Sequence, residues 1–552
     1  MPERKLGAQI SHMLAARGVE VIFGIPGVHN QELYRGIEEA GITHVLARHE
    51  QGAGFMADGY ARATGMPGIC YVITGPGLTN ALTPLGQAYS DSVPVLAISS
   101  CLDETAATRG QLHQMRDQAG AARAVCDWSE EARSAEAAYA LIDRAFTEFE
   151  TCCPRPKHLT VPIKLLESAA PEPPRSRLFV NRTQESAKPG SFIGFALNTV
   201  GKPLRQTTGA LDGVARRLLR AERPVIIFGG GAVAAGGRNG PARRVLEQSK
   251  AASFMTYAGR GIAAPDDPLT FGSSLARPDS AKILDAADFV LIIGTDLSEG
   301  DLWRKEAGYR PGAVIVNIDP EVLSDGHPED QRIQADALHF LADLAHALKD
   351  GEPNASWKPE LVAGYRDRWR AQVEAERPGI IAVADALKAA LPEATMIYSD
   401  MTQFAYTAKE IWDMDRPGHW HHPTGFGTLG YALPAAIGGA VARKGKPTMA
   451  IAGDYGFQYT LQELGTAVEL GLPLPIFVWD NGKLQEIEES MVAAQIPPNA
   501  VVARNPDFLA LARAYGAHAA APKTLAEMQE AVRAAFDAGG PTLIHVTPRI
   551  AG

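Results

Sequence analysis

Two short stretches each place a side-chain oxygen that could bind a metal directly after an apolar run. The first is Gly453-Asp454, after TMAIA, and the second is Asp480-Asn481, after LPIFVW. In parallel sheets ligands bind beyond the carboxyl ends of the strands, so both pairs are expected at such ends. One carboxylate and one amide oxygen suit Mg²⁺ or Ca²⁺, with phosphate, water and backbone oxygens as the other ligands. The spacing therefore predicts a metal-diphosphate site, although two ordinary strand-end turns would use the same residue types.

The elements that must hold these residues alternate between two patterns. Helical segments such as LGAQISHMLAARG repeat their apolar residues at a period near 3.6, whereas the strands are apolar runs. A further helix is expected after Gly456, with its first N–H groups directed at the phosphates. This alternation predicts parallel sheets covered by helices on both faces. The expected strands are VEVIFGIPG, THVLARHE, GICYVITGPG, PVLAISS, PVIIFGGG, FVLIIGT, AVIVNIDP, TMIYSD, TMAIAGD, LPIFVWDN and PTLIHVTP.

The chain has 552 residues, which is too long for one hydrophobic core. A proline-rich stretch over residues 171–203 and a polar stretch over residues 349–378 interrupt the alternation and are interpreted as connections. We predict three α/β domains with doubly wound parallel sheets, over residues 1–170, 190–350 and 375–552.

The charge, the N-terminal sequence and the cysteines argue against several classes of protein. The net charge is −10 without a dense block of lysine and arginine, which argues against a nucleic-acid partner. The N-terminal stretch MPERKLGAQISHML has no signal-peptide core, and no window reaches about 18 uninterrupted apolar residues. The five cysteines are not in metal-ligand spacing. We therefore expect a cytoplasmic protein with no membrane partner.

Gly453-Asp454, followed 27 residues later by Asn481, resembles the signature of thiamine-diphosphate enzymes. The whole chain resembles the acetolactate synthase and 2-oxo-acid decarboxylase superfamily, which has pyrimidine-binding, central and diphosphate-binding domains in this order. The resemblance implies thiamine diphosphate and Mg²⁺ as cofactors, with Asp454, Asn481 and the Lys483 carbonyl as metal ligands. The chain departs from the family in having Asp480 where Asn is usual and a large residue, Tyr455, after the aspartate.

Four further segments carry the resemblance. Residues 23–65 resemble the first-domain core and put Glu50 at the position of the activating glutamate. A carboxylate bonded to the aminopyrimidine ring favours its imino tautomer, whose nitrogen can take the proton of the weakly acidic thiazolium carbon. Residues 423–440 resemble the segment beneath the cofactor, with Leu429 as an apolar wedge and the Gly427 carbonyl as acceptor for the exocyclic amine. The loops ITGPGLTNAL and RGQLHQMRDQ resemble active-site loops, and His113 and Gln114 lie where the family places substrate-contacting residues. Further cofactor contacts are expected from Pro26, Thr402, Gln403, Gly453, Tyr455 and Gly456.

Two other patterns are weaker. HWHHP, with His419, His421 and His422, resembles a metal motif but has no carboxylate or cysteine partner in the sequence, so we do not expect a metal there. The glycine run over residues 228–237 resembles a dinucleotide fingerprint, which is a weak signal alone. Some relatives bind FAD in the central domain and others bind nothing there; we favour a central domain without FAD.

The substrate is suggested by GKLQEIEESM, which follows Asn481. In acetolactate synthases the corresponding helix carries an apolar residue and, one turn later, a tryptophan; a gapless alignment puts Glu486 and Ser490 at these positions. They are four residues apart and would share a helix face, with Glu489 one step further round. A buried carboxylate needs a partner, so this wall favours a cationic substrate tail, unless the helix faces solvent and its acids are merely hydrated. Val28, Gln485 and Ile487 are further expected substrate contacts.

The chain most resembles the 5-guanidino-2-oxopentanoate decarboxylase branch of the superfamily. The resemblance implies decarboxylation of that 2-oxo acid to 4-guanidinobutanal and CO₂, with His29 lining the pocket. The alternatives are acetolactate-synthase-type carboligation and a catalytically silent binding homologue, which the presence of Glu50, Asp454 and Asn481 disfavours. In the family, the pyrimidine domain of one chain meets the diphosphate domain of another, so we expect a homodimer or homotetramer.

Overall fold

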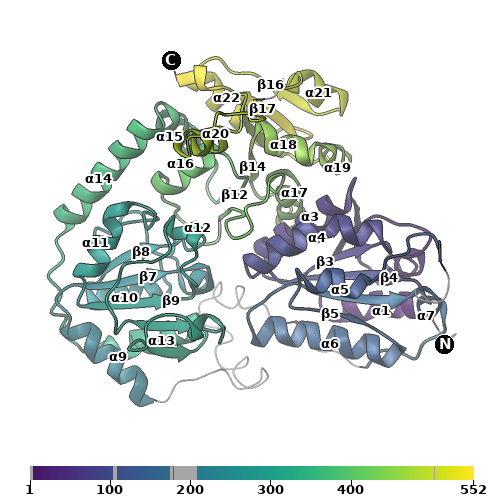
Figure 1. Cartoon of the computed structure of the whole chain (residues 1–552), viewed down its shortest axis with the longest axis horizontal. Helices are drawn as coiled ribbons and strands as arrows, with labels where there is room; N and C mark the ends of the chain where they lie inside the picture. The colour runs from purple at the N-terminus through teal and green to yellow at the C-terminus, as the bar shows by residue number, and fades with distance from the viewer. Residues whose placement is uncertain (1–3, 104–108, 175–177, 180–207, 503, 552) are drawn as a thin grey trace.

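The protein is described by a computed structural model over residues 4–103, 109–174, 178–179, 208–502 and 504–551 (Figure 1). Most of the predicted connection over residues 171–203 lies outside these ranges. The described chain forms three parallel sheets, each in its own segment of the sequence, which confirms the predicted fold class. Within these ranges no helix is both long and apolar enough to cross a bilayer.

The first domain is a six-stranded parallel sheet in the order β2-β1-β3-β4-β6-β5. Neighbouring residues of one strand, such as Ile22 and Phe23, enter different apolar cores, so the sheet is buried on both faces. Its strands are β1 Val21–Gly24, β2 Thr43–Leu46, β3 Gly68–Val72, β4 Val95–Cys101, β5 Trp128–Glu131 and β6 Lys157–Pro162. Its helices are α1 Leu6–Ala16, α2 Gln31–Tyr34, α3 Glu50–Thr64, α4 Pro76–Ser90, α5 Gln118–Arg123, α6 Ala135–Thr151 and α7 Ile163–Glu167.

The central domain has a five-stranded parallel sheet in the order β11-β10-β9-β7-β8. The polar stretch over residues 349–378 is more than a connection, because it forms the long helix α14, and Val362 and Trp369 on that helix enter the apolar core of the central domain (Figure 1). The strands are β7 Pro224–Phe228, β8 Ala252–Met255, β9 Phe289–Ile293, β10 Val314–Asn317 and β11 Gln331–Gln334. The helices are α9 Thr208–Arg220, η2 Gly230–Ala235, α10 Pro241–Ser249, α11 Pro278–Ala286, α12 Glu299–Leu302, η3 Val322–Ser324, α13 Ala337–Leu348 and α14 Pro359–Glu376.

The third domain is again a six-stranded parallel sheet, in the order β13-β12-β14-β15-β17-β16. Gly453 pairs with Trp479 in the register of β14 and β15, so Asp454 and Asp480 follow neighbouring strand ends. The strands are β12 Met396–Ser399, β13 Trp420–His421, β14 Thr448–Gly453, β15 Pro475–Trp479, β16 His518–Ala520 and β17 Thr542–Val546. The helical segments are α15 Ile380–Ala390, α16 Gln403–Ile411, α17 Ala432–Arg443, α18 Asp454–Tyr459, η4 Leu461–Glu463, α19 Leu464–Glu469, α20 Gln485–Ala493, α21 Phe508–Ala514, α22 Leu525–Phe536 and η5 Pro548–Ala551.

The first and third domains share one apolar core where α3 packs on α17 (Figure 1). Two glycines allow the close approach: a Cβ added at Gly59 or at Gly438 would lie 2.0 Å from a backbone oxygen of the opposite helix. At this interface Tyr431 donates a hydrogen bond to the buried carboxylate of Asp58, at 2.7 Å. The domains that carry the two halves of the predicted site are therefore fixed to each other within the chain.

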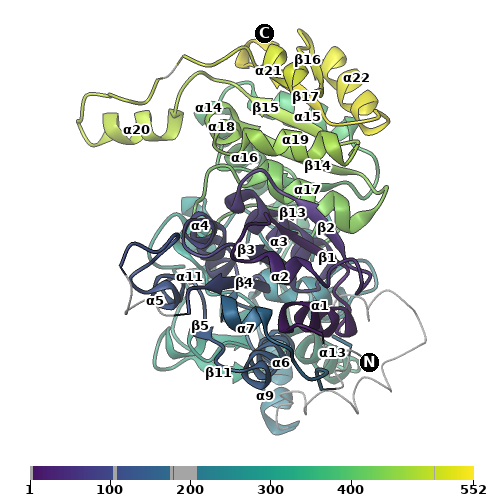
Figure 2. The same ribbon diagram turned by 90° about the vertical axis from the view of Figure 1, so that its right-hand side faces the viewer.

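One helix stands apart from this packing. Figure 2 shows α20 on a long loop that projects away from the rest of the third domain. None of its residues is buried, and the side chains of Ile487 and Val492 are more than half exposed. The base of the loop is closed by a hydrogen bond of 2.8 Å from the Leu484 amide to the Val501 carbonyl.

Candidate active site

The predicted metal ligand Asp454 is the first residue of α18, and it is 3% exposed. The expectation that this helix would begin after Gly456 was wrong, because the helix begins at Asp454 itself. An aspartate in the first turn of a helix is favourable, since its charge complements the unpaired N–H groups there.

The carboxylate of Asp454 lies beside that of Asp480. The Asn505 side-chain amide donates to both, at 2.6 Å to Asp454 Oδ2 and 2.9 Å to Asp480 Oδ1. Burial, followed by proximity to Asp480, raises the pKa of Asp454. Burial opposes ionisation of Asp480 too, but the bond from His545 Nε2, at 2.8 Å, leaves the pKa of Asp480 below its usual value. Sequence reasoning missed Asn505 and His545, which are far from Asp454 along the chain.

The other predicted cofactor residues of this domain surround the turn after β15. Asn481 Oδ1 accepts a hydrogen bond from the Lys483 amide at 3.3 Å, and Asn481 Nδ2 donates to Gln403 Oε1 at 3.4 Å. Thr402 precedes α16, and a Cβ added at Gly453 would lie 3.0 Å from its hydroxyl. The Lys483 side chain forms an ion pair with Glu488, which leaves only its backbone carbonyl as a candidate metal ligand.

These residues fit thiamine diphosphate and Mg²⁺. A Cβ added at Gly482, which has a φ of +73°, would meet no atom within 4 Å, so the turn borders open space. The oxygens that border this edge are a carboxylate, an amide and a backbone carbonyl, which is a ligand chemistry that Mg²⁺ accepts alongside phosphate. Asp454 and Asn481 are thus available to a metal, and Gln403 and Thr402 lie next to them.

The segment that resembles the cofactor-supporting loop runs from Pro423 into α17. Gly427 is exposed and has a φ of +68°, and Leu429 is half-buried. The loop is tied to the first domain, because Gly425 donates its amide to Asp91 and the Thr428 hydroxyl donates to Gln87, each at 2.9 Å. A buried carboxyl that the sequence did not reveal, Asp400, accepts the Gly430 amide at 2.9 Å, and burial raises the pKa of Asp400 to about 7.

Glu50 lies at the carboxyl edge of the first sheet, as the first residue of α3. Its side chain is largely buried, and its Oε2 accepts a hydrogen bond from Asn80 Nδ2 on α4 at 2.9 Å. The turn before it is fixed from the third domain by the fully buried Glu463, whose Oε1 accepts the His49 amide at 2.9 Å and the Arg48 amide at 3.1 Å. Burial raises the pKa of Glu463 to about 7.

A buried polar network holds the glycine turn beside Glu50. Gln118 Oε1 accepts the Gly75 amide at 3.0 Å, and its Nε2 donates to the Ser100 carbonyl at 2.7 Å and to Thr160 Oγ1 at 2.9 Å. A Cβ added at Gly77 in the same turn would lie 3.3 Å from Glu50 Oε1. Gln118 belongs to RGQLHQMRDQ, but its role could not be read from the sequence because its partners come from three other segments.

His29 and His113 come together from two loops of the first domain. Their ring centroids are 4.8 Å apart in an edge-to-face arrangement, and the Nδ1 atom of each is buried without a hydrogen-bond partner. Burial and then the neighbouring His113 lower the pKa of His29. Gln114 Oε1 accepts the Gly110 amide at 2.9 Å. Pro26 and Val28 are exposed on the loop of His29.

Apart from Val28, the predicted substrate residues lie on α20 and differ in their surroundings. Glu486 Oε2 pairs with Arg377 Nη2 at 3.2 Å, while Glu486 Oε1 is buried and has no hydrogen-bond partner. Burial raises the pKa of Glu486, and Arg377 opposes this shift. Ile487 and Ser490 are exposed, and Gln485 donates to Glu489. Arg377 follows the last turn of α14 and was not expected at the site.

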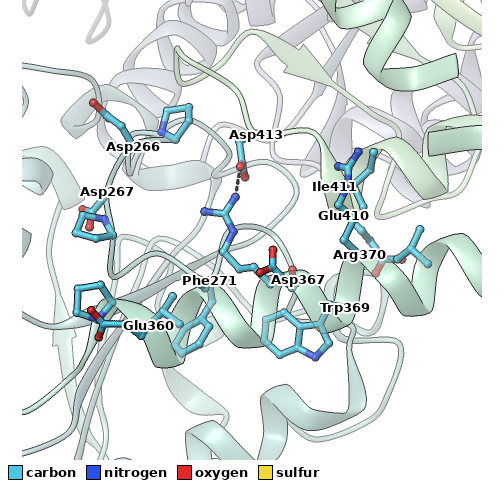
Figure 3. A pocket seen from close by; sticks show the side chains of 18 residues that line it. Asp266, Asp267, Phe271, Glu360, Asp367, Trp369, Arg370, Glu410, Ile411 and Asp413 are labelled. Atoms are coloured by element: carbon cyan, nitrogen blue, oxygen red, sulfur yellow. Dashed lines mark hydrogen bonds and ion pairs between the residues drawn. The ribbon is translucent and has the colours of Figure 1, made fainter. Parts of the chain in front are cut away.

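The described residues therefore form separate clusters. Within them, no hydrogen bond or ion pair joins Glu50, His29 or His113 to Asp454 or Asn481. A cavity of about 480 Å³ lies elsewhere, between α14, the end of α16 and a loop of the central domain (Figure 3). None of the predicted site residues lines it, and its acidic side chains are those of Asp266, Asp267, Glu360, Asp367, Glu410 and Asp413.

The two weaker sequence patterns have local structural roles. His422 Nδ1 bonds to Ser399 Oγ at 2.9 Å, and among the described residues no group of three His, Cys, Asp or Glu side chains could hold a metal. In the glycine run after β7, a Cβ added at Gly229 would lie 2.3 Å from the Gly294 oxygen, so this glycine serves close packing of two strand-end loops.

Comparison with known proteins identifies the family of the chain. Models of the thiamine pyrophosphate enzymes match residues 4–121 as the N-terminal thiamine-pyrophosphate-binding domain, 211–344 as the central domain and 400–546 as the C-terminal thiamine-pyrophosphate-binding domain. The chain is 40% identical to a probable 2-ketoarginine decarboxylase of Pseudomonas aeruginosa, over 99% of this chain and 94% of that protein. It is 26% identical to the large subunit of acetolactate synthase isozyme 1 of Escherichia coli, over 99% and 94% of the two chains. For isozyme 2 of the same organism the identity is 28%, over 98% and 95%.

Proposed function

The chain belongs to the thiamine pyrophosphate enzyme family, and on that premise we propose that it decarboxylates 5-guanidino-2-oxopentanoate, also called 2-ketoarginine. The 2-oxo acid takes up one proton and yields 4-guanidinobutanal and CO₂. The relative named as a probable 2-ketoarginine decarboxylase supports this choice, because the similarity extends over nearly the whole of both chains.

The observation that supports this choice of substrate is the hydrogen bonding of the Glu486 carboxylate. Its Oε1 atom is buried and unpartnered on the helix that begins four residues after Asn481, while its Oε2 atom is already held by Arg377. A buried acceptor without a donor is costly, and a guanidinium offers donors in the geometry that a carboxylate accepts. A substrate with a guanidinium tail would supply the missing donor.

We next assign roles to the residues of the proposed cofactor site. Asp454, Asn481 and the Lys483 carbonyl would hold Mg²⁺, and Gly427, Leu429, Thr402 and Gln403 would border thiamine diphosphate. When bound, this cofactor supplies the carbon nucleophile for the 2-oxo group and accepts the electron pair left by CO₂. Glu50 would keep a carboxylate against the pyrimidine ring, and the turn with Gly75 and Gly77 orders the wall beside it.

His29 and His113 would act on the substrate side. Each imidazole has an unpartnered, buried Nδ1, so each can donate to or accept from a substrate oxygen. We assign the two histidines and Gln114 to orienting the 2-oxo acid, and one of the histidines to delivering the proton that completes the aldehyde. His113 has a φ of +64°, so the loop holds this residue in an uncommon conformation.

The test is to supply apo-protein with Mg²⁺, thiamine diphosphate and a panel of 2-oxo acids, and to identify products by mass spectrometry. We expect 4-guanidinobutanal from 5-guanidino-2-oxopentanoate, and no product with the Asp454→Ala variant. Acetolactate from pyruvate as the main product would instead favour carboligation, the activity named for the acetolactate synthase relatives. No product from any 2-oxo acid would contradict both functions.

A further inference from the structure

The amide of Asn505 is fully engaged between the two strand ends. Its Nδ2 atom lies 2.6 Å from Asp454 Oδ2 and 2.9 Å from Asp480 Oδ1, and its Oδ1 atom accepts from Gln458 Nε2 at 3.2 Å. Gln458 lies on α18, and its Nε2 atom also donates to the Asp454 carbonyl at 3.0 Å. One side chain thus uses both donors and its acceptor around the candidate metal ligand.

The chemistry of the partners fixes which way this amide faces. An ionised carboxylate can only accept hydrogen bonds, so the NH₂ group of Asn505 must face Asp454 and Asp480. The amide nitrogen of Gln458 donates to the oxygen of Asn505, which agrees with the same orientation. The bond from Asn505 to Asp454 Oδ2 consequently fixes the orientation of the Asp454 carboxylate.

We infer that Asn505 is a positioning residue for metal binding, which acts by holding the Asp454 carboxylate in one orientation. The inference rests on the proposed Mg²⁺ site of Asp454 and Asn481. Hydrogen bonds to a ligating carboxylate orient it, and loss of such an outer partner commonly costs about 10- to 100-fold in metal affinity. Asn505 donates as well to Asp480, so one amide offsets part of the repulsion between the two neighbouring carboxylates.

The position of Asn505 along the chain gives this bond a second effect. Asn505 follows the projecting segment that carries α20, and the bond from Leu484 to Val501 closes the base of that segment. The candidate metal site therefore touches both ends of this segment, through Asn481 and Lys483 at its start and through Asn505 at its end. Metal binding should steady the base of the α20 segment, and part of this effect should depend on Asn505.

The experiment measures Mn²⁺ binding by electron paramagnetic resonance in the presence of thiamine diphosphate and without substrate. Asn505→Ala should weaken Mn²⁺ binding about 10- to 100-fold. Asn499→Ala is the matched control: Asn499 is exposed on the same segment, and its side chain donates only to the Pro497 carbonyl, at 3.4 Å. We expect that control to bind Mn²⁺ like the wild type. Unchanged or tighter binding in Asn505→Ala would overturn the inference.

A structural effect is separated from a positioning effect by a double-mutant cycle. Asp454→Asn keeps a ligand oxygen, and adding Asn505→Ala to it should cost clearly less affinity than in the wild type. An equal loss in both backgrounds would mean that Asn505 does not act through Asp454, and would overturn the inference. Hydrogen exchange of residues 484–502 gives the second measure, since cofactor-dependent protection should appear in the wild type and be reduced in Asn505→Ala.

Failure of the proposed function would look different. If Asp454→Ala binds Mn²⁺ like the wild type, the metal site itself is wrong, and the inference falls with it. If the metal measurements follow the expectation while no 2-oxo acid reacts, the substrate proposal fails and the role of Asn505 stands.

Discussion

Glu50 is held by neighbours on both sides of its side chain. Asn80 donates to Oε2, and the turn with Gly77 lies against Oε1. Glu50→Gln keeps this shape but removes the charge that supports proton exchange with the cofactor. We expect thiamine diphosphate binding to persist while kcat falls about 10²- to 10⁴-fold. Glu38→Gln, at an exposed site on the same domain, is the control. Near-normal turnover in Glu50→Gln would contradict the role of Glu50.

Glu486 can be tested through the ratio of two substrates. A charge-assisted hydrogen bond contributes about 1.5–3 kcal/mol, so Glu486→Gln should lower kcat/KM for 5-guanidino-2-oxopentanoate about 10- to 100-fold. Pyruvate, which has no cationic tail, should be little affected. Steady-state kinetics on both substrates checks this, with Glu489→Gln as the control from the exposed face of α20. A ratio that does not move would show that Glu486 does not recognise the tail.

At the scale of the elements, the interface between η4 and α3 should respond to pH. Burial raises the pKa of Glu463 from 4.5 to about 7. Its folded pKa is above its unfolded pKa, so its stabilising contribution is complete below about pH 4.5 and is lost as the pH rises through 7. At about 1.4 kcal/mol per pKa unit, the loss is on the order of 3 kcal/mol.

The variant Glu463→Gln cannot ionise and should lack this loss. Thermal unfolding of both proteins between pH 4.5 and 8 checks the prediction, because the stability of the wild type relative to the variant should fall as the pH rises. Asp400, whose pKa burial also raises to about 7, contributes to both proteins alike and cancels in the comparison. Parallel curves over this range would contradict the assignment.

Sequence pattern predicted the central strands well because apolar runs are local. β1, β3, β4, β7, β9, β14, β15 and β17 all coincide with runs identified from the sequence. β5, β6, β8, β11, β13 and β16 were missed. All but β6 lie at the edge of their sheets, and WSEE, QRIQ and HAA, the sequences of β5, β11 and β16, carry little apolar signal. β6, with the sequence KHLTVP, is an interior strand, but Lys157, His158 and Thr160 interrupt its apolar run. The start of α18 was placed too late because one turn of helix has no periodicity to recognise.

The residues of the candidate site were likewise predicted only where the sequence carries a recognisable pattern. Glu50, Asp454 and Asn481 were found because their types recur at a known spacing, and their roles stay predictions. Arg377 and Asn505 were not found, because they are 109 and 51 residues from the side chains they bind. No local sequence pattern indicates such a contact, because the two residues come together only in the folded chain.

At the scale of the whole molecule, the family resemblance leads to a prediction about assembly, because in the family the pyrimidine domain of one chain meets the diphosphate domain of another. The first-domain cluster around Glu50 and the third-domain cluster around Asp454 are not joined by a hydrogen bond or ion pair between the described residues named above. We predict that each active site takes Glu50 from one chain and Asp454 from another, so the active unit is at least a dimer. Light scattering at micromolar concentration, beside an activity assay, checks this; a fully active monomer would rule it out.

A complementation experiment sharpens this test. Glu50→Gln and Asp454→Ala chains are each expected to be inactive alone, but a mixed dimer of the two contains one site with both residues intact. Mixing the variants under conditions that exchange subunits should therefore restore up to about one quarter of the wild-type activity for random pairing of equal amounts. Absence of any recovery in proven mixed dimers would place both residues of each site in a single chain.

The exposed helix α20 has a consequence for how this enzyme could change over evolutionary time. In a hydrophobic core each residue limits the substitutions of its neighbours, because a change of one methylene group disturbs the close packing. None of the residues of α20 is buried, so exchanges along it cost the fold little. Apart from Glu486, which pairs with Arg377, the residues of this helix can then change and alter the choice of substrate while the residues of the cofactor site stay the same. In a library of variants changed only at residues 485–493, we expect new 2-oxo-acid preferences to arise with the fewest variants that fail to fold.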